Sequence, residues 1–386
     1  MRIVWVSNWN SDGHRGGAGT YARCILQLVE RAYPDAEIVR IEPEARRSGA
    51  ARDLRQAACL LRALASGHSA KWHFDYDSGV AARVRSAVAQ AEPNVIFLIG
   101  TGTGIYRTHL PAGAPVIVVV PSIESRTYED QLARMPAPLR WVLRDWLGDA
   151  RKHLDFERRV LGGAQGCVAV SGEQQALVLE MIGKPLPSLV VPPVFPETSV
   201  SRRAQPRSPI RLGFLGKFSW WPNREAIDWF LAEIWPAANR DGVELHVCGE
   251  GSEAFDRRAP GVRAYGYRED LADFWRDTDI FINPMRSPTG VNVKVCEAIH
   301  HGLPVLSSPE GLRGLDLAAD RAVVQCNSPQ AWRAQLEPGA LDELRKRAPA
   351  AALRRSFDLT PVVPRFRTFV DSLRPREECR QAASSA

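Results

Sequence analysis

The sequence lacks paired cysteines, long apolar runs and a signal peptide, and each absence narrows the class of protein. Its seven cysteines are scattered, odd in number and without any C-x-x-C spacing, so we expect reduced thiols in a reducing compartment rather than a disulfide framework. No apolar run reaches the roughly 18 residues that a membrane span requires. The N-terminal stretch lacks the charged region and the long apolar region of a signal peptide. We therefore expect a cytoplasmic protein.

The charge excess is small and does not identify a partner. A net charge of +6 and an isoelectric point near 9.0 permit an anionic partner, but a mild excess of this kind is common. The chain carries no motif for recognising DNA or RNA, and no nucleic acid is expected as a partner. Phosphate groups on a small donor or on a membrane surface would fit the charge equally well.

Length and patterning indicate two α/β domains. A chain of 386 residues exceeds the roughly 100–200 residues of an ordinary domain. Short apolar runs alternate with helical patterns, as in β-α-β units that build a parallel sheet. The predicted strands are residues 2–6, 95–99, 116–120 and 166–170 in the first half, and residues 210–215, 244–248, 280–283 and 304–307 in the second.

A proline-rich stretch marks the predicted domain boundary. Five prolines and three arginines lie between Val191 and Pro209, a composition that suits a linker. The predicted organisation is an N-terminal Rossmann-like domain over residues 1–195, a linker over 196–209, a second Rossmann-like domain over 210–365, and a C-terminal helix and tail over 366–386.

A glycine-rich segment follows the first predicted strand. It reads Gly16-Gly17-Ala18-Gly19-Thr20-Tyr21, and apolar residues at helical spacing come after it. Glycines let the backbone approach a ligand closely, and the N–H groups at a helix start attract anions. The spacing differs from the dinucleotide motif G-x-G-x-x-G, and no acidic ribose partner follows at the expected distance. Two interpretations stay open, a phosphate or sugar contact and a plain tight turn.

The most informative segment runs from Pro284 to Ala298. Gly290 lies in an irregular loop after a predicted strand, and the run from Val291 is expected to open a helix. Such a helix start directs N–H groups and a partial positive charge at a phosphate, and Lys294 adds a full charge. Glu297 lies three residues further on the same helix face, where a carboxylate can accept hydrogen bonds from ribose hydroxyls. The alternative is an ordinary surface Lys–Glu pair.

Two other segments are candidates for the same site. Gly216 and Lys217 follow the strand 210–215, and this turn can place a second cation at the same sheet edge; the alternative is a solvated lysine. The segment Tyr265-Gly266-Tyr267-Arg268 is a candidate for lining a base pocket, with an exposed turn as the alternative.

Taken together, these segments resemble the retaining glycosyltransferases of family 4, which have the GT-B fold. The matching blocks in the second half are Gly213–Asn223, Gly266-Tyr267, Pro284, Gly290–Ala298 and Gly302-Leu303-Pro304-Val305, and they cover most of residues 210–315. In the first half the resemblance rests on the Gly16-Gly17 loop and residues 157–171. It implies an α/β fold of two Rossmann-like domains whose parallel sheets face each other across a cleft, with the donor mainly on the C-terminal side and the acceptor on the N-terminal side.

The resemblance implies a nucleotide diphosphate sugar as the donor. Glu297 would contact the ribose, and Lys217 and Lys294 would neutralise the diphosphate, which gains charge as the glycosidic bond breaks. With two lysines and a helix N-terminus in these roles, no metal and no other cofactor is expected. The implied donor-binding residues are Gly17, Gly216, Tyr267, Gly290, Val291, Asn292 and Glu297.

Three positions depart from the family pattern. Thr289 stands where E-x7-E members carry their first glutamate, and Asn223 stands where a second basic residue is usual, although Lys294 fits a G-x-x-x-K-x-x-E subgroup. The family's histidine after an N-terminal strand is missing, because residues 116–120 lead into Pro121-Ser122-Ile123-Glu124. With the two lysines, Glu124 is a candidate catalytic residue that contacts donor or acceptor; the alternative is a surface glutamate at a helix start.

Residues 139–159 form a candidate membrane-facing helix. Apolar residues follow the helical period at positions 139, 142, 143, 146, 147, 150 and 154, while Arg140, Arg144, Arg151 and Lys152 lie largely outside that stripe. A basic amphipathic helix can lie on anionic lipid, and a peripheral contact at the inner face of a membrane would imply a lipid-linked acceptor. The alternative is a core-facing helix with a solvated basic side.

The predicted function is transfer of a sugar from a nucleotide diphosphate sugar to a hydroxyl of a glycan, a lipid-linked saccharide or a small molecule, as in polysaccharide biosynthesis. Retention is implied by the resemblance alone. One alternative is a nucleotide-sugar epimerase or hydrolase on the same fold. Another is a non-catalytic relative that binds a partner, since the histidine and the first glutamate are missing. An NAD-dependent dehydrogenase is disfavoured, because the N-terminal glycine segment lacks its fingerprint.

Overall fold

The computed structural model describes residues 1–9, 16–42, 50–197, 208–237, 242–287, 290–317 and 319–374, with the side chains of the helix at residue 50 described from residue 58 onward. Thr289, most of the predicted linker and the predicted tail beyond residue 374 lie outside these ranges. The chain divides into two compact units. The first consists of residues 1–14, 25–191 and 362–386, and the second of residues 15–24 and 192–361.

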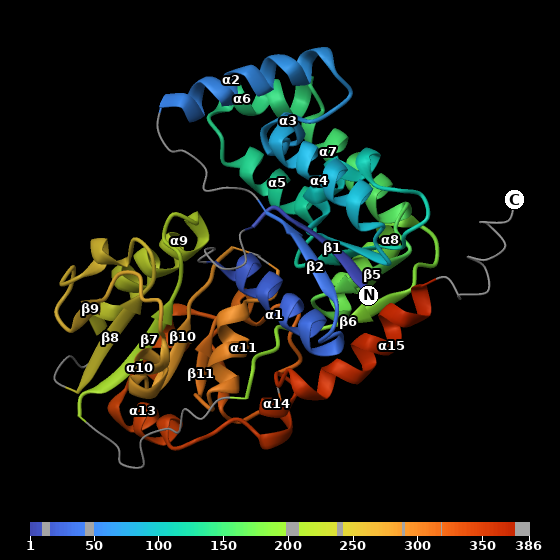
Figure 1. The fold of residues 1–386 in the computed structure, drawn as a ribbon. Helices are drawn as coiled ribbons and strands as arrows, with labels where there is room; N and C mark the ends of the chain where they lie inside the picture. Colours follow the sequence, from blue (N-terminus) through green and yellow to red (C-terminus); the bar gives the residue numbers. More distant parts are fainter. Residues whose placement is uncertain are drawn as a thin grey trace, which may run out of the picture. The chain divides into compact units, whose positions relative to one another are not determined.

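The first unit is built on a parallel sheet of six strands in the order β2-β1-β3-β4-β5-β6 (Figure 1). Its central strands are continuous apolar runs because helices cover them on both faces, and every residue of β3 and β4 is buried. The strands are β1 (Arg2–Ser7), β2 (Glu37–Ile41), β3 (Val95–Ile99), β4 (Val116–Val120), β5 (Gly166–Ala169) and β6 (Ser188–Val190).

Helices cover this sheet, and the C-terminal helix is one of them. The α-helices are α1 (Gly17–Ala32), α2 (Ala50–Ala65), α3 (Ala70–Asp75), α4 (Ser78–Ala91), α5 (Glu124–Ala133), α6 (Ala137–Arg140), α7 (Asp149–Gly162), α8 (Gly172–Ile182) and α15 (Val363–Leu373). A 3₁₀-helix η1 (Thr101–His109) and a π-helix η2 (Trp141–Trp146) complete the set. Phe366 of α15 stacks on Phe97 of β3 at a ring distance of 6.1 Å, so the chain returns to the first unit at its end.

The second unit repeats this plan with the strand order β12-β11-β10-β7-β8-β9. All six strands are parallel. They are β7 (Ile210–Leu215), β8 (Val243–Cys248), β9 (Val262–Ala264), β10 (Ile280–Asn283), β11 (Val305–Ser307) and β12 (Val323–Gln325). A core of aliphatic and aromatic side chains lies between the sheet and its helices, and Phe214, Phe230, Trp235 and Trp332 are almost fully buried in it.

The helices of the second unit are short. The α-helices are α9 (Trp221–Trp229), α10 (Ala272–Asp277), α11 (Val293–His300), α12 (Pro329–Gln335), α13 (Pro338–Arg345) and α14 (Ala351–Arg355). The other helical segments are η3 (Phe230–Ile234), η4 (Trp235–Ala237), η5 (Ser252–Phe255), η6 (Glu310–Leu312) and η7 (Thr360–Val362). The first residues of α1 also belong to this unit.

The predicted α/β class with two parallel sheets is confirmed. Four strands, β3, β4, β7 and β10, have the predicted bounds, and helix α11 begins at Val293, two residues later than predicted. The prediction missed β2, β6, β9 and β12, which are short and partly exposed and therefore lack a continuous apolar run.

Two expectations concern the compartment and the membrane. The six cysteines in the described ranges are buried and form no disulfide. Within the same ranges, none of the helices combines the length and the hydropathy that crossing a bilayer requires.

Candidate functional site

Lys294 lies in the first turn of α11, in a mostly apolar environment. Its Nζ donates a hydrogen bond to Asn223 Oδ1 at 2.9 Å, lies 3.6 Å from Met285 Sδ, and stands 4.0 Å from the centroid of the Phe214 ring. Burial lowers the pKa of Lys294 to about 7. An ammonium group whose described neighbours are an amide oxygen, a thioether and a ring gains strongly from an anionic ligand, because its charge is poorly solvated.

Glu297 lies one turn later on α11, and Trp275 contacts its carboxyl group. Its Oε1 accepts a hydrogen bond from Trp275 Nε1 at 3.2 Å, and the Trp275 ring stacks on His301 at 5.1 Å. Burial raises the pKa of Glu297 to about 7, against the hydrogen bond from Trp275 and the charge of Arg23. The lysine and the glutamate therefore have different partners, unlike an ordinary surface pair.

The backbone before α11 provides further donors. Asn292 occupies the N-cap position without a side-chain cap hydrogen bond, and Val293 is the first helical residue. The buried Nδ2 of Asn292 has no hydrogen-bond partner within the described part of the chain. Together with the N–H groups of the first helical turn, this amide suits an anion or a hydroxyl-rich ligand. Gly290 and Val291, both partly exposed, come directly before it.

Gly17 belongs by its contacts to the second unit, although it follows the first strand of the first. A Cβ atom added at Gly17 would lie 3.6 Å from Val293 Cγ2, which is ordinary van der Waals contact. Packing against protein atoms therefore does not require glycine at this position. A ligand that approaches the backbone at the start of α1 would require it.

Asn223 connects the turn after β7 with α11. Its Nδ2 donates to the carbonyl oxygen of Lys217 at 2.9 Å, while its Oδ1 accepts from Lys294. The side chain occupies the space beside Gly216, where an added Cβ would lie 2.9 Å from Asn223 Cγ. The structure thus brings together the backbone of Lys217 and the ammonium of Lys294. Lys217 Nζ itself lies 3.4 Å from Glu250 Oε2, with both side chains partly exposed.

Tyr267 lies in an exposed turn at the same sheet edge. Its side chain is 41% exposed, and Gly266 has a φ of 68°, a backbone conformation that favours glycine. The Gly266 N–H donates to Ser252 Oγ at 2.9 Å, which fixes the turn. The segment is thus an exposed turn in this structure, and a contact between Tyr267 and a base stays a prediction.

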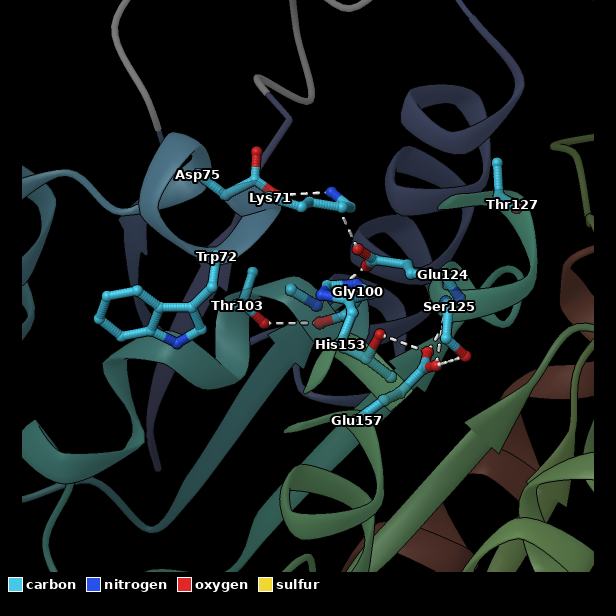
Figure 2. A network of polar contacts seen from close by, with 12 residues as sticks. Lys71, Trp72, Asp75, Gly100, Thr103, Glu124, Ser125, Thr127, His153 and Glu157 are labelled. Atoms are coloured by element: carbon cyan, nitrogen blue, oxygen red, sulfur yellow. Dashed lines mark hydrogen bonds and ion pairs between the residues drawn. The ribbon is translucent and has the colours of Figure 1, made fainter. Parts of the chain in front are cut away.

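A second polar cluster lies in the first unit around Glu124, the first residue of α5 (Figure 2). Its Oε1 accepts from the Gly102 N–H at 2.9 Å, and Lys71 Nζ lies 3.5 Å from its Oε2. Lys71 also pairs with Asp75 at 2.5 Å. The Glu124 side chain is only 14% exposed, so it is not the solvated surface glutamate that the sequence left as the alternative.

Glu157 of α7 fixes the position of Glu124. Its Oε1 accepts from Glu124 N at 2.8 Å and from Thr101 Oγ1 at 2.7 Å, and its Oε2 accepts from the backbone and hydroxyl of Ser125. The carboxylate thereby caps the N-terminus of α5, where Ile123 offers no side-chain cap. Burial, and then the charge of Glu124, raises the pKa of Glu157.

The segment after β3 is shaped to hold Glu124. Gly100 has a φ of 80°, and an added Cβ there would lie 2.8 Å from the Trp9 ring and 3.0 Å from Glu124 Oε1. At Gly102 an added Cβ would lie 2.9 Å from Asn8 Nδ2 and 3.0 Å from Glu124 Oε2. Sequence reasoning missed this cluster. The alternating Gly100-Thr101-Gly102-Thr103-Gly104 at a strand end was the available signal.

Histidine is present in this cluster, although it is absent from the position where the family carries it. His153 of α7 is 1% exposed, and its Nδ1 lies 3.2 Å from Ser69 Oγ. Burial lowers the pKa of His153 to about 4, so the ring is neutral at physiological pH. Lys71, His153 and Glu157 come from α3 and α7, and of the three only Glu157 lies in a segment, residues 157–171, on which the resemblance rests.

The described ranges contain no group of three or more histidine, cysteine, aspartate or glutamate side chains arranged to hold a metal ion.

Comparisons with known proteins agree with this architecture. Residues 209–337, about a third of the chain, match the family model described as glycosyl transferases group 1. No curated protein matches the chain in sequence.

Three solved structures show the same fold at low sequence identity. Sucrose-phosphate synthase from Thermosynechococcus elongatus is similar with a TM-score of 0.68 and 14% identity, over 100% of both chains. HepE of Anabaena, in complex with UDP and glucose, gives a TM-score of 0.62 and 14% identity over 96% of this chain and 100% of its own. WaaG, a glycosyltransferase involved in lipopolysaccharide biosynthesis, gives 0.59 and 14% over 95% and 99%.

The two parallel sheets and the matching segment define the class: this chain is an enzyme of the glycosyltransferase type with a GT-B fold. Its second unit carries the group 1 glycosyl transferase segment, and that segment contains Lys217, Lys294 and Glu297. Enzymes of this class transfer a sugar from a nucleotide sugar.

Proposed function

We propose that this glycosyltransferase uses a uridine diphosphate sugar and transfers the sugar, with retention, to a hydroxyl of a glycan, a lipid-linked saccharide or a small molecule. The observation that carries the proposal is the arrangement at α11, where a poorly solvated ammonium, a helix N-terminus and a carboxylate lie within two turns. The complexes of HepE with UDP, with UDP and glucose and with UDP-glucose support uridine as the base.

In this proposal, different residues of α11 and of the loop before it bind different parts of the donor. Lys294 and the N–H groups from Gly290 to Asn292 hold the diphosphate, and Glu297 accepts hydrogen bonds from the ribose hydroxyls. Lys217 adds a second cation when it turns from Glu250 to the diphosphate. Their charges stabilise the leaving diphosphate as the bond to the sugar breaks. Gly17 allows the backbone of α1 close to the phosphates, Gly216 keeps the β7 turn open, and Tyr267 lies beside the base.

Glu124 is the proposed contact of the first unit with the reacting sugar or the acceptor. Its carboxylate is held by the Gly102 N–H and by Lys71, and it stands at the carboxyl ends of β3 and β4. Ligands of open parallel sheets bind at this edge. A carboxylate fixed from two sides is preorganised to accept a hydrogen bond from a hydroxyl group.

The proposal includes a cytoplasmic enzyme in peripheral contact with the inner face of a membrane through residues 139–159. Such a contact would bring a lipid-linked acceptor to the first unit. No metal and no resident cofactor takes part in the proposed reaction.

The test is calorimetric binding of UDP, GDP, ADP and dTDP to the wild type and to Lys294→Ala and Glu297→Ala. We expect UDP to bind, and each substitution to weaken binding by about 1–3 kcal/mol, the range for a lost charged hydrogen bond. The matched control is the exposed Lys346–Glu343 pair of α13, which has the same three-residue spacing. Lys346→Ala and Glu343→Ala are expected to leave UDP binding unchanged.

Two outcomes would contradict the proposal. If no nucleotide binds the folded protein, the donor site is wrong and a partner-binding relative becomes the better description. If UDP-sugar is consumed without an acceptor, to give an epimer or free sugar, the enzyme is an epimerase or hydrolase on this fold.

A further inference from the structure

The exposed apolar side chains of the first unit gather on two helices. Among the described residues of this unit, the large hydrophobic side chains that are exposed all lie on α2 or on the continuous helix α6–η2. They are Leu61 (67% exposed), Leu64 (47%), Leu139 (37%), Trp141 (58%) and Trp146 (62%). Single exposed apolar residues are common, but five on two neighbouring helices indicate a binding surface.

These two helices share one small core, so their exposed sides belong to one region of the molecule. Leu60 and Ala63 of α2 pack in the same cluster as Leu143 of η2 and Leu132 of α5. Lys152 of α7 also donates hydrogen bonds to the carbonyl oxygens at the end of α2. Figure 1 shows α2 and α6 next to each other, far from β6 and α15 of the same unit. We call the exposed parts of residues 58–66 and 134–147 the α2–η2 surface.

The stripe expected from the sequence is divided by the structure. Leu143 is 2% exposed and faces the small core, so the core-facing interpretation holds for this position. Trp146 of the stripe faces solvent instead, and so does Trp141, which lies outside the stripe. The alternative of a solvated basic side does not explain two exposed tryptophans. Burying an aromatic side chain of this size lowers the free energy by several times the thermal energy, so leaving two of them in water is unfavourable.

The charges of the α2–η2 surface are mainly positive. Its segments contain Arg62, Arg134, Arg140 and Arg144 against one acidic residue, Asp145. Arg140 stands between Leu139 and Trp141 in the sequence, and Arg144 lies one helical turn further on, so the segment that carries the apolar side chains also carries cations. Tryptophan beside arginine suits the boundary of a bilayer, where the ring enters the apolar layer and the guanidinium meets lipid phosphates.

A groove that shares Arg144 and Asp145 with this surface is lined by charged residues of both signs. It has a volume of about 550 Å³ and is lined by residues of α5, η2, α7 and α8. Arg126, Arg144, Arg151 and Arg158 line it, together with three acidic residues. The groove begins at Ile123 and Ser125, the neighbours of Glu124. An anionic headgroup entering it would therefore approach the carboxylate that the proposed function places near the acceptor.

We propose that the α2–η2 surface docks onto a bilayer containing anionic phospholipid, with Trp141 and Trp146 as the inserted residues. This inference rests on the membrane contact in the proposed function and assigns that contact to particular residues. Lipid binding can be measured separately, because it does not require sugar transfer. A second copy of the chain is the less suitable occupant, because a symmetric contact would bring one positive patch against another.

The experiment is flotation of the full chain with vesicles of phosphatidylcholine, with and without phosphatidylglycerol. We expect binding to vesicles that contain phosphatidylglycerol and a decrease with added salt. The variant Trp141→Ser/Trp146→Ser is expected to bind these vesicles at least about tenfold more weakly. The variant Arg140→Gln/Arg144→Gln is expected to weaken binding to vesicles that contain phosphatidylglycerol and to leave any binding to pure phosphatidylcholine vesicles unchanged.

Matched controls lie in the second unit. Tyr265→Ser removes an aromatic ring that is 39% exposed, and Arg257→Gln removes a cation whose side chain is 80% exposed. Neither is expected to change vesicle binding. Circular dichroism and UDP calorimetry on each variant separate the two proposals: loss of vesicle binding with UDP binding retained identifies the surface.

Three results would overturn this inference. The wild type could fail to float with the anionic vesicles, or the double tryptophan variant could float as well as the wild type. Sedimentation could instead show that the wild type self-associates and that the tryptophan variant is monomeric, which would assign the surface to a second copy. If UDP fails to bind while the surface binds vesicles, the donor proposal is wrong and the surface stands.

Discussion

At the scale of single residues, the proposed donor site consists of ionisable side chains that are buried and poorly solvated. Lys294 and Glu297 lie one turn apart on α11, and burial moves the pKa of each to about 7. Without a ligand these shifts cost folding free energy, since the neutral forms are favoured in the folded protein and the charged forms in the unfolded chain. A ligand that pairs with these groups offsets this cost. Residues that serve only to pack the protein would not carry such a cost without a ligand.

Glu297→Gln is expected to stabilise the protein above neutral pH and to weaken UDP binding. The pKa of Glu297 is raised from 4.5 to about 7, so its contribution to stability is full below about 4.5 and is lost as the pH rises to about 7. Glutamine stays neutral and keeps an oxygen for the Trp275 N–H. Above neutral pH the variant should gain on the order of 1–3 kcal/mol in the free energy of unfolding.

Urea unfolding of both proteins across this pH range provides the measurement. The difference between variant and wild type should grow as the pH rises from about 4.5 to about 7 and then level off. A difference independent of pH would mean that Glu297 is already ionised in the folded protein, and the assigned burial effect would be wrong.

At the scale of elements, the first unit shows how a helix start can be built from distant segments. Helix α5 has no local cap, and Glu157 of α7 supplies one across the end of β3. The glycines after β3 leave room for the Glu124 carboxylate, and Lys71 of α3 balances its charge. Four separate elements therefore fix the position of one candidate catalytic side chain.

Glu157→Gln is expected to destabilise the first unit and to disturb Glu124. The two oxygens of Glu157 accept from four groups, and glutamine keeps only one of these oxygens. Leaving a buried donor unpaired costs about 1–3 kcal/mol in the free energy of unfolding. Urea unfolding measures this loss, and sugar transfer at saturating UDP-sugar should fall while UDP binding is retained.

The control for this substitution is Glu180→Gln on α8, an exposed glutamate of the same unit. It should change the free energy of unfolding by no more than about 0.5 kcal/mol. Equal stability of Glu157→Gln and the wild type would show that the cap does not hold α5.

At the scale of the whole molecule, the two units have the same plan and carry different candidate residues. Each has a six-stranded parallel sheet, and each presents its candidate residues in the segments that follow its central strands. The proposed donor residues lie in the second unit, which also includes the start of α1. The Glu124 cluster and the α2–η2 surface lie in the first.

Hydrogen exchange with and without UDP is expected to show this division. Protection should increase at residues 290–297, at residues 216–223 and at the start of α1, because bound ligand stabilises the segments that it contacts. Helix α13 of the same unit, which contains none of the proposed donor residues, serves as the internal reference. Protection confined to β3, β4 and α5 would place the nucleotide in the first unit and contradict the assignment.

The sequence was sufficient for those features that depend on neighbours along the chain. Apolar runs predicted β3, β4, β7 and β10 to the residue. β3 and β4 are apolar at every position because both of their faces are buried, whereas β7 and β10 each include one polar residue, Arg211 and Asn283. Spacing on one helix predicted that Lys294 and Glu297 would lie at the start of α11. Edge strands such as β9 have few buried positions, and their pairing is decided by the neighbouring strand.

Only the tertiary structure decided how residues far apart in the chain meet. The contact of Lys294 with Asn223 spans 71 positions and that of Thr101 with Glu157 spans 56, and no local period encodes such contacts. The apolar stripe predicted within residues 139–159 is likewise divided, because packing against α2 and α5 buries Leu143 and leaves Trp146 exposed. Periodicity determines which side chains share a face of a helix, but tertiary packing determines which other element, if any, covers that face.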